Sequence, residues 1–290
     1  MAQNRTPEID KLYQDIVSYR DSEKFMELLQ FVKKFSHIAP YNAMLIHTQK
    51  PGSSYVATAR EWMDRWGRTI KPGARPLIIL QPFGPVAFVY EYNDTDGKPL
   101  PDSVIAPFRS KSIISKSMLD RLIDNIKADG VEIDFNNYGT DYAGMIQCND
   151  RAKILKKSLP SGSCSIRSYY TIVVNDNLSD TSKYTTILHE LAHLYCGHLY
   201  HDHKVIKWLP ERWGLSPGQM EFEAETVCWL VCERLGIDNP SAEYLSGYLQ
   251  ENGEIPLVSV DAIMKATGTI ESFTVGIKQP RKELLISKDN

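Results

Sequence analysis

The sequence predicts an α+β fold made of two domains. Its 290 residues are 42% hydrophobic, which is enough to bury a sizeable core. Apolar residues recur at helical spacing in some segments and gather in β-branched and aromatic runs in others. Residues 93–107, with Asp94-Thr95-Asp96-Gly97 and several prolines, form the best boundary. We therefore expect a smaller α+β domain over 1–107 and a larger one with a small sheet over 108–290.

Local patterns define the elements of the first domain. Apolar residues recur every three to four positions in its first segments, as they do on one face of a helix. A capping box at Thr58-Ala59-Arg60-Glu61 opens a short helix that Gly67 can end. Two prolines and a glycine at 82–85 separate two β-rich runs and predict a hairpin. The expected elements are helices over 9–16, 25–35 and 58–67 and strands over 77–80 and 86–92.

The second domain should combine a small sheet with longer helices. The β-branched and aromatic run 169–174 is followed by a turn at 175–177, which predicts a strand. A helix with a single apolar stripe then begins near 180, and Gly197 can stop it. Further helices are expected over 119–126, 216–235, 242–249 and 258–266, followed by a charged, frayed tail from Gln279.

The strongest chemical signal is the string His189-Glu190-Leu191-Ala192-His193. Two histidines four positions apart project from one face of a helix, so both imidazoles can reach one Zn²⁺. Both lie roughly opposite the apolar stripe, so they are not core residues of this helix. Glu190 leans towards the open position of the metal. The string predicts His189 and His193 as zinc ligands and Glu190 as the catalytic residue.

A zinc ion that keeps a water molecule needs a third protein ligand. Ser216-Pro217-Gly218-Gln219 opens the next helix as a capping box, and three glutamates follow in its first turns. Glu221 and Glu225 share a face, whereas Glu223 points about 200° away from Glu221. We assign Glu221 as the third ligand and Glu225 as a carboxylate that accepts a ring N–H from a ligand histidine. Glu225 as the ligand is the alternative, and Glu223 is the least favoured.

Other histidines and cysteines near the site are expected to have no direct role. His198, His201 and His203 are interpreted as loop residues close to the site, one of which could stabilise an oxyanion. Cys228 and Cys232 fall on the same helical face as Glu221, so a thiolate ligand is the alternative to buried structural cysteine.

The metal motif resembles a known family. His189 to Leu194 with Gly197-His198, followed by Glu221-Phe222-Glu223-Ala224-Glu225, is similar to the ImmA/IrrE-type metallopeptidases and the related catalytic domain of ArdC-type antirestriction proteins. The resemblance covers roughly residues 140–240. It implies a zincin-like peptidase domain of the gluzincin type, in which a glutamate is the third ligand. Many members carry asparagine four positions after that ligand, where this chain has Glu225. The resemblance also implies that the strand ending near Val174 holds an extended peptide by edge pairing.

A basic, aromatic stretch marks the first domain. Residues 30–80 contain eight basic and two acidic side chains, a formal charge of +6, interleaved with aromatic rings. Positive charge beside rings that stack on bases is what sequence-tolerant binding of single strands requires. The alternative is that the rings form the core and the charges a solvated face. The residues expected at such an interface are Lys50, Arg60, Trp62, Arg68, Lys71 and Arg75.

A looser resemblance concerns the same stretch. Pro40-Tyr41-Asn42-Ala43-Met44-Leu45-Ile46, Tyr55-Val56-Ala57-Thr58 with Trp62, and the segment from Gly67 to Arg75 resemble the N-terminal domain of ArdC-like proteins. That domain binds single-stranded DNA, so the resemblance implies such a partner here.

Composition limits the alternatives. The net charge of −3 gives no global attraction to nucleic acid, so such binding depends on the local basic stretch. The five cysteines are odd in number and lack CxxC pairing, which favours a reducing cytoplasm. The first residues lack the apolar core of a signal peptide, and no run approaches the roughly 18 apolar residues of a membrane helix. We expect a cytoplasmic protein with no membrane partner.

These patterns predict a zinc metallopeptidase with a protein or peptide substrate. Zinc held by the three ligands acidifies a water, and Glu190 accepts its proton before attack on a peptide carbonyl. A second hypothesis is a DNA-binding antirestriction or accessory protein of a mobile element, in which zinc is mainly structural. Zinc content and activity of a Glu190→Gln protein distinguish the two, because they separate the presence of the metal from its use.

Overall fold

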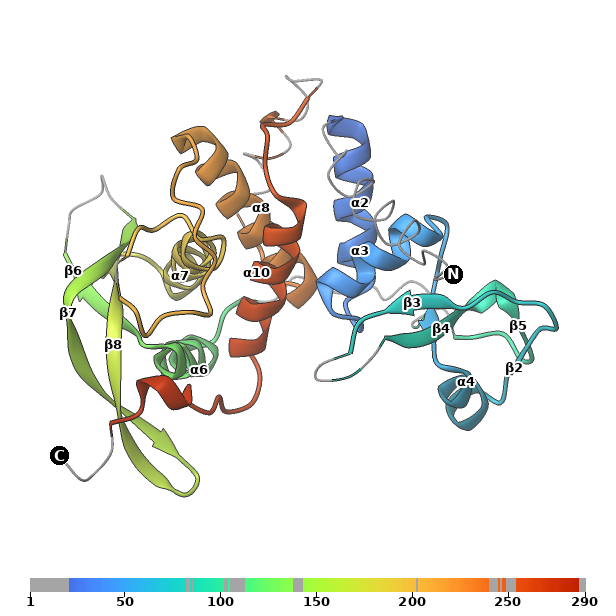
Figure 1. The fold of residues 1–290 in the computed structure, drawn as a ribbon, viewed down its shortest axis with the longest axis horizontal. Helices are drawn as coiled ribbons and strands as arrows, with labels where there is room; N and C mark the ends of the chain where they lie inside the picture. The colour runs from blue at the N-terminus through green and yellow to red at the C-terminus, as the bar shows by residue number, and fades with distance from the viewer. Residues whose placement is uncertain are drawn as a thin grey trace, which may run out of the picture. The chain divides into compact units, whose positions relative to one another are not determined.

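The computed structural model has the predicted α+β fold, built as two compact units (Figure 1). One unit runs to Ser110 and includes Leu249–Ile255, and the other comprises Lys111–Tyr248 and Pro256–Asn290. The structure describes residues 21–81, 84, 86–101, 104, 113–137, 143–201, 203–239, 245, 247–248 and 254–286. The expected boundary at 107–108, the helix expected over 9–16 and most of the helix expected over 242–249 lie outside these residues.

The described residues of the first unit form three helices and two small sheets. Two of the helices and the hairpin were predicted from sequence, whereas α3 was not. Its strands form a three-stranded sheet in the order β1-β4-β3 and a two-stranded sheet of β2 and β5, with neighbours antiparallel. The elements are α2 (Ser22–Lys34), α3 (Pro40–Gln49), β1 (Val56–Ala57), α4 (Ala59–Trp66), β2 (Thr69–Ile70), β3 (Leu77–Ile79), β4 (Ala87–Glu91), a 3-10 turn (Tyr92–Asp94) and β5 (Thr95–Asp96).

The second unit places helices on a three-stranded sheet. The strand order is β6-β8-β7, with β6 parallel and β7 antiparallel to the central β8. Helix α7 packs on β7 and β8 and also contacts α8 and α10 (Figure 1). The elements are α6 (Lys116–Ile126), a 3-10 turn (Lys127–Asp129), β6 (Val131–Asn136), β7 (Gly144–Leu159), β8 (Gly162–Asn175), α7 (Asp180–Tyr195), α8 (Pro217–Leu235), α10 (Val260–Phe273) and a 3-10 turn (Lys282–Leu284).

The central strand β8 explains why this sheet forms. Tyr170, Ile172 and Val174 alternate along it and are fully buried, as expected of a strand covered by helices. The predicted strand 169–174 is therefore confirmed, although β8 begins earlier, at Gly162. Its parallel partner β6 and antiparallel partner β7 occupy both of its edges.

The tail expected to fray from Gln279 is docked as far as residue 286. The Arg281 backbone N–H donates to the Ala128 carbonyl at 3.0 Å, and the Ile286 N–H donates to the Ser165 carbonyl at 3.0 Å. Leu284 is fully buried. These backbone bonds and one apolar anchor outweigh the charge that led us to expect a mobile end.

The described helices are also short or polar compared with membrane spans. None of them has both the length and the apolar character needed to cross a bilayer.

Candidate metal centre

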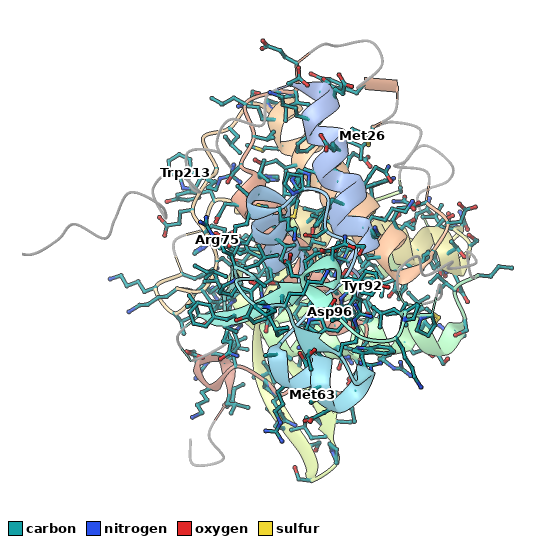
Figure 2. The ribbon with its side chains drawn as sticks, turned by 90° about the vertical axis from the view of Figure 1, so that its right-hand side faces the viewer. Met26, Met63, Arg75, Tyr92, Asp96 and Trp213 are labelled. Atoms are coloured by element: carbon teal, nitrogen blue, oxygen red, sulfur yellow. The ribbon has the colours of Figure 1, made fainter. Side chains whose placement is uncertain are left out.

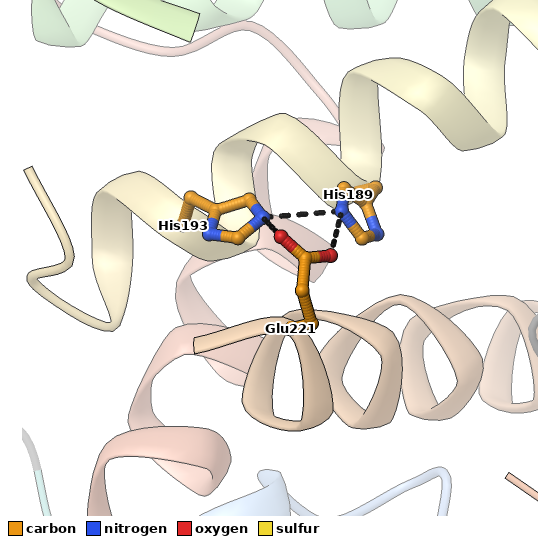
Figure 3. Close-up of side chains that lie close together, drawn as sticks. All are labelled: His189, His193 and Glu221. Carbon is orange, nitrogen blue, oxygen red and sulfur yellow. Dashed lines mark hydrogen bonds and ion pairs between the residues drawn. The ribbon is translucent and has the colours of Figure 1, made fainter. Parts of the chain in front are cut away.

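Two helices bring His189, His193 and Glu221 together. Ser179 caps α7 by accepting the Ser182 N–H. The two histidines lie four positions apart inside this helix and are therefore one turn apart on the same face. The predicted capping box of Ser216 opens α8 and places Glu221 in its second turn. Figure 3 shows the Glu221 carboxylate pointing from α8 at both imidazoles of α7. The assigned ligand atoms all lie within 4.8 Å of one another.

The spacing of these atoms fits a tetrahedral zinc. Ligand atoms placed about 2.0–2.1 Å from a tetrahedral centre are separated from each other by about 3.3–3.4 Å. The two Nε2 atoms of His189 and His193 are 3.1 Å apart. The Glu221 carboxylate oxygens lie 3.4 Å from Nε2 of His189 and 3.5 Å from Nε2 of His193. Two imidazoles and a carboxylate are also the donor types that zinc takes in catalytic sites.

The protonation preferences of the three groups suit a cation. Burial acts against a charged His189, but the hydrogen bond with Glu221 and the charge of Glu225 raise its pKa to about 9. Burial and the charge of His189 lower the pKa of His193 to about 4, so this imidazole is neutral near pH 7. The hydrogen bond with His189 lowers the pKa of Glu221. A metal ion would replace the proton that His189 and Glu221 share.

Glu190 lies beside the ligand cluster without joining it. The residue is buried, and its carboxylate accepts a hydrogen bond from the backbone of Ile146 on β7. Burial raises the pKa of Glu190, and the charge of His189 partly offsets this effect. A carboxylate held above its usual pKa next to a metal site is suited to taking and returning a proton.

Glu225 lies on the His189 side of the site. Its Oε1 is 3.6 Å from Nδ1 of His189, close enough for an ion pair but longer than a hydrogen bond. The role assigned to Glu225, accepting a ring N–H from a ligand, therefore stays a prediction.

The role of Glu223 was not predicted from the sequence. Helix geometry correctly indicated that it points away from Glu221, but this side chain is fully buried and contacts the ligand His193 through His198. His198 was interpreted as a loop residue, and Arg212 was not singled out. Arg212 donates to both oxygens of Glu223, at 2.7 and 2.6 Å. The one sequence signal was His198 itself, five positions after His193.

Cys196, His198 and Glu223 form a second group of potential metal ligands, but their chemistry does not suit a metal. Burial raises the pKa of the Cys196 thiol well above its usual value, so it is not a thiolate. Both Glu223 oxygens are already bound by the guanidinium of Arg212. The guanidinium of Arg212 therefore occupies the position that a metal would need.

A cleft opens onto the assigned ligands on two sides. One cavity of about 420 Å³ is lined by the three assigned ligands, Glu190, His198 and residues of β7. A second cavity of about 320 Å³ lies on the side of Glu225 and is also lined by Gly144, His189 and Glu190. The two cavities share these last three residues, so Gly144 of β7 borders both, and Met145 and Ile146 border the larger one.

This cleft corrects the expectation about the substrate strand. The strand ending near Val174 is β8, whose two edges are both occupied by β6 and β7. Among the described residues, β7 pairs with β8 alone, so its other edge is open, and β7 rather than β6 borders the cleft. The sequence did not reveal β7 because its many charged and polar residues hide the pattern of a strand.

Gly197 holds the loop that carries Arg212 against the end of α7. It has a φ of +77°, and a Cβ there would lie 2.3 Å from the Pro210 carbonyl oxygen. We expect Gly197→Ala to lower Tm by several degrees, because the left-handed conformation alone costs an alanine about 1–2 kcal/mol. Differential scanning fluorimetry would show this, with Gly218→Ala as the control, since nothing lies within 4 Å of a Cβ at Gly218. Equal Tm values would contradict the expectation.

The six residues expected to bind nucleic acid differ in their exposure to solvent. Trp62 is 0% exposed and its indole N–H donates to the Tyr90 carbonyl, so the ring belongs to the core and cannot stack on a base. Lys50 pairs with Asp94 at 2.8 Å. Arg68 is buried as well, which leaves Arg60, Lys71 and Arg75 on the surface; Arg75 is labelled in Figure 2.

Most of the other rings in this stretch are also core residues. Phe31, Phe35 and Tyr55 are buried, and Tyr55 packs edge to face on Trp62. The alternative interpretation, in which rings form the core and charges a solvated face, therefore describes these side chains. Binding of single-stranded DNA stays a prediction that depends on the exposed cations.

Arg68 has a structural role that can be measured. Its guanidinium donates to Thr95 Oγ1 at 2.7 Å, to the Thr95 carbonyl at 2.8 Å, and to the carbonyls of Gly97 and Lys98. We expect Arg68→Ala to destabilise the first unit by several kcal/mol, because each buried acceptor left without a donor costs about 1–3 kcal/mol. Urea unfolding followed by tryptophan fluorescence should show a lower midpoint than for Arg75→Ala. Matching midpoints would show that Arg68 is dispensable for folding.

Fold and site together resemble one class of protein. An α+β unit in which an HExxH helix faces a helix bearing a glutamate is typical of zinc peptidases. Residues 151–204 match the family model of the IrrE N-terminal-like domain, peptidase family M78. This match supports an ImmA/IrrE-type metallopeptidase family for a segment that contains β8, α7 and the HExxH string. It ends before α8, and it does not reach the basic stretch, whose resemblance to ArdC-like proteins stays a prediction.

The comparison with curated proteins adds one distant relative. The chain is 24% identical over 322 aligned positions to an uncharacterized protein of Bacillus anthracis. The alignment covers 95% of this chain and 51% of that protein, so the chain spans about half the length of the relative it matches. No solved structure matches the chain.

Proposed function

We propose that this protein is a zinc-dependent peptidase in which His189, His193 and Glu221 hold the metal and Glu190 transfers protons. The observation that carries the proposal is the tetrahedral spacing of the three ligand atoms beside a buried carboxylate. The family match supports a peptidase-type enzyme. When bound, zinc would acidify a water and polarise a carbonyl.

The residues around the ligands each have a task in such a reaction. Glu190 takes a proton from the attacking water and returns it to the leaving amine, so the same carboxyl acts first as base and then as acid. Its burial favours the neutral form, which helps it to carry the proton between the two steps. The backbone N–H of Ile146 keeps the carboxylate oriented towards the cleft.

The open edge of β7 suits an extended peptide. Residues 144–149 of β7 carry no charged side chain, and Gly144, Met145 and Ile146 line the cleft. A peptide that pairs with this edge would make backbone hydrogen bonds, and its scissile carbonyl would lie near Glu190. The substrate class that follows is a flexible segment of a protein, because pairing with the edge requires a peptide whose own backbone groups are free.

The exposure of Glu221 favours a catalytic over a structural zinc. Structural zinc sites have four protein ligands and are closed, whereas catalytic sites keep one position open. The Glu221 side chain is 52% exposed, and the 420 Å³ cavity borders all three assigned ligands. Among the described residues, this cluster contains three potential ligands rather than four.

Removal and restoration of the metal test the proposal. We expect the purified protein to carry one zinc and to cleave unfolded protein substrates such as casein, and a chelator to abolish cleavage. One equivalent of Zn²⁺ should restore it. Cleavage that survives full removal of zinc, or a protein that binds zinc without cleaving any of a broad set of denatured substrates, would favour the structural alternative.

A further inference from the structure

A chain of buried polar groups leads from the assigned ligand His193 into the protein. Nδ1 of His193 is 2.9 Å from Nδ1 of His198. Nε2 of His198 is 2.8 Å from a carboxylate oxygen of Glu223. The side chains of His198 and Glu223 are 2% and 0% exposed, so water does not compete for these contacts.

Glu223, the last group in this hydrogen-bonded series, is held from two directions. Arg212 donates to both oxygens of Glu223, and the Ser259 backbone N–H donates to Oε1 of Glu223 at 2.7 Å. Both oxygens of Glu223 thus accept N–H groups, which leaves no place for a carboxyl hydrogen, so the group is a carboxylate. A carboxylate only accepts hydrogen bonds, so His198 must donate to it from Nε2.

The direction of the hydrogen bond from His198 to Glu223 determines the tautomers of both histidines. A neutral imidazole that donates from Nε2 has a free lone pair on Nδ1, so Nδ1 of His198 is an acceptor. Nδ1 of His193 must then carry the hydrogen that the 2.9 Å contact needs. The lone pair of His193 is left on Nε2, which is the atom that faces His189 and Glu221.

We propose that His198 is a positioning residue for the metal ligand His193, and that Glu223, held by Arg212 and Ser259, fixes the tautomer of His198. This inference rests on the proposed metal site. The two ligand histidines are then held differently, since His189 has a carboxylate, Glu225, directly beside Nδ1, whereas His193 has an imidazole between it and its carboxylate. Partners of this kind orient the ring and make the ligand more basic.

Two substitutions of His198 in the full-length protein separate positioning from packing. In His198→Asn, the side-chain oxygen can take the place of Nδ1 and accept the His193 N–H. In His198→Phe, the ring shape is kept but the acceptor is lost. If His198 only filled space, Phe would be the milder change. The control is His203→Phe, because His203 contacts the Asn149 carbonyl and none of the assigned ligands.

The measurement is the zinc dissociation constant, obtained by competition with a chromophoric chelator, together with the visible absorption of bound Co²⁺. We expect His198→Phe to weaken zinc binding roughly 10- to 100-fold and to change the Co²⁺ spectrum. His198→Asn should lie close to the unsubstituted protein, and His203→Phe should match it. Wild-type affinity in a folded His198→Phe protein, or equal weakening in Phe and Asn, would overturn the inference.

A second measurement covers the case in which His198→Phe does not fold. In the zinc-loaded unsubstituted protein, ¹⁵N NMR of the imidazoles should show His193 protonated at Nδ1 and His198 protonated at Nε2. A His198 protonated at Nδ1 would overturn the inference. Failure of the proposed function gives a different result, because the unsubstituted protein would then bind no zinc or would bind it without cleaving any substrate.

Discussion

Glu190→Gln is expected to keep zinc and the fold but to lose peptide hydrolysis. Glu190 is not among the atoms that cluster around the metal position, so the substitution removes no ligand. Glutamine has the same shape and can still accept the Ile146 N–H, but it cannot take a proton from water. Loss of a general acid–base group costs about 10²–10⁴-fold in rate, and here one group serves in both proton transfers.

The test compares zinc content and cleavage rate in the same preparations. Glu132→Gln is the matched control, since Glu132 pairs with Lys153 on the sheet and has no part in the site. Zinc content should be the same in all three proteins, and the cleavage rate should fall in Glu190→Gln alone. Undiminished cleavage in that variant would show that Glu190 is not the proton acceptor, whatever the metal does.

Glu221→Ala and Glu223→Ala are expected to fail in different ways. Glu221 is half exposed and its carboxylate contacts only histidines, so its loss should remove most of the zinc and leave the fold intact. Glu223 is fully buried and neutralises Arg212, which is 22% exposed, so its loss leaves an unpaired, partly buried cation. Breaking a buried pair costs about 3–5 kcal/mol, and the partial exposure of Arg212 lowers that cost. Glu221 is thus expected to determine the zinc content, and Glu223 the folding stability.

Zinc content and thermal unfolding in the presence of a chelator separate these effects. Glu221→Ala should unfold at the temperature of the unsubstituted apoprotein, whereas Glu223→Ala should unfold well below it. Glu225→Ala decides between the two ligand assignments. If zinc is lost only in Glu225→Ala, the third ligand is Glu225; if Glu221→Ala and Glu223→Ala retain equal zinc, our assignment of Glu221 is wrong.

The parts of the site that depend on local geometry could be predicted from sequence. A helix fixes which face a residue lies on, so the spacing of His189, His193 and Glu221 was enough to place them as candidate ligands on two helices. The capping box at Ser216 marked where the second helix begins. The same arithmetic indicated that Glu223 points away from Glu221, and the structure confirms this direction.

The hydrogen-bond partners of Glu223 could not be predicted from the sequence. Its partners are His198, which lies 25 positions earlier, and Ser259, which lies 36 positions later. Such contacts depend on how a loop and a distant helix pack, and no local pattern records that packing. For the same reason, the exposed or buried state of Trp62 was undecided, because a ring suited to stacking on a base is equally suited to a core.

Strand β7 shows how the two kinds of information differ. It forms a long hairpin with β8, so its first residues pair with residues far along the sequence. Its many solvent-facing side chains also obscure the alternation of apolar and polar residues that marks a strand. The order β6-β8-β7 then decides which strand borders the cleft. The central strand β8 was predicted from the sequence, but the substrate edge expected on β8 lies on its neighbour β7.

The open edge of β7 has a consequence for the behaviour of the protein at high concentration. An unpaired strand edge can join the same edge of a second molecule and start aggregation. Beyond the uncharged stretch at the cleft, β7 carries the exposed cations Arg151 and Lys156 and no acidic residue after Asp150, whereas Lys153 is paired with Glu132. Two such segments placed side by side would bring cations together. Mutual repulsion of these charges would therefore protect the edge from self-association while leaving Gly144, Met145 and Ile146, which line the cleft, accessible to a peptide.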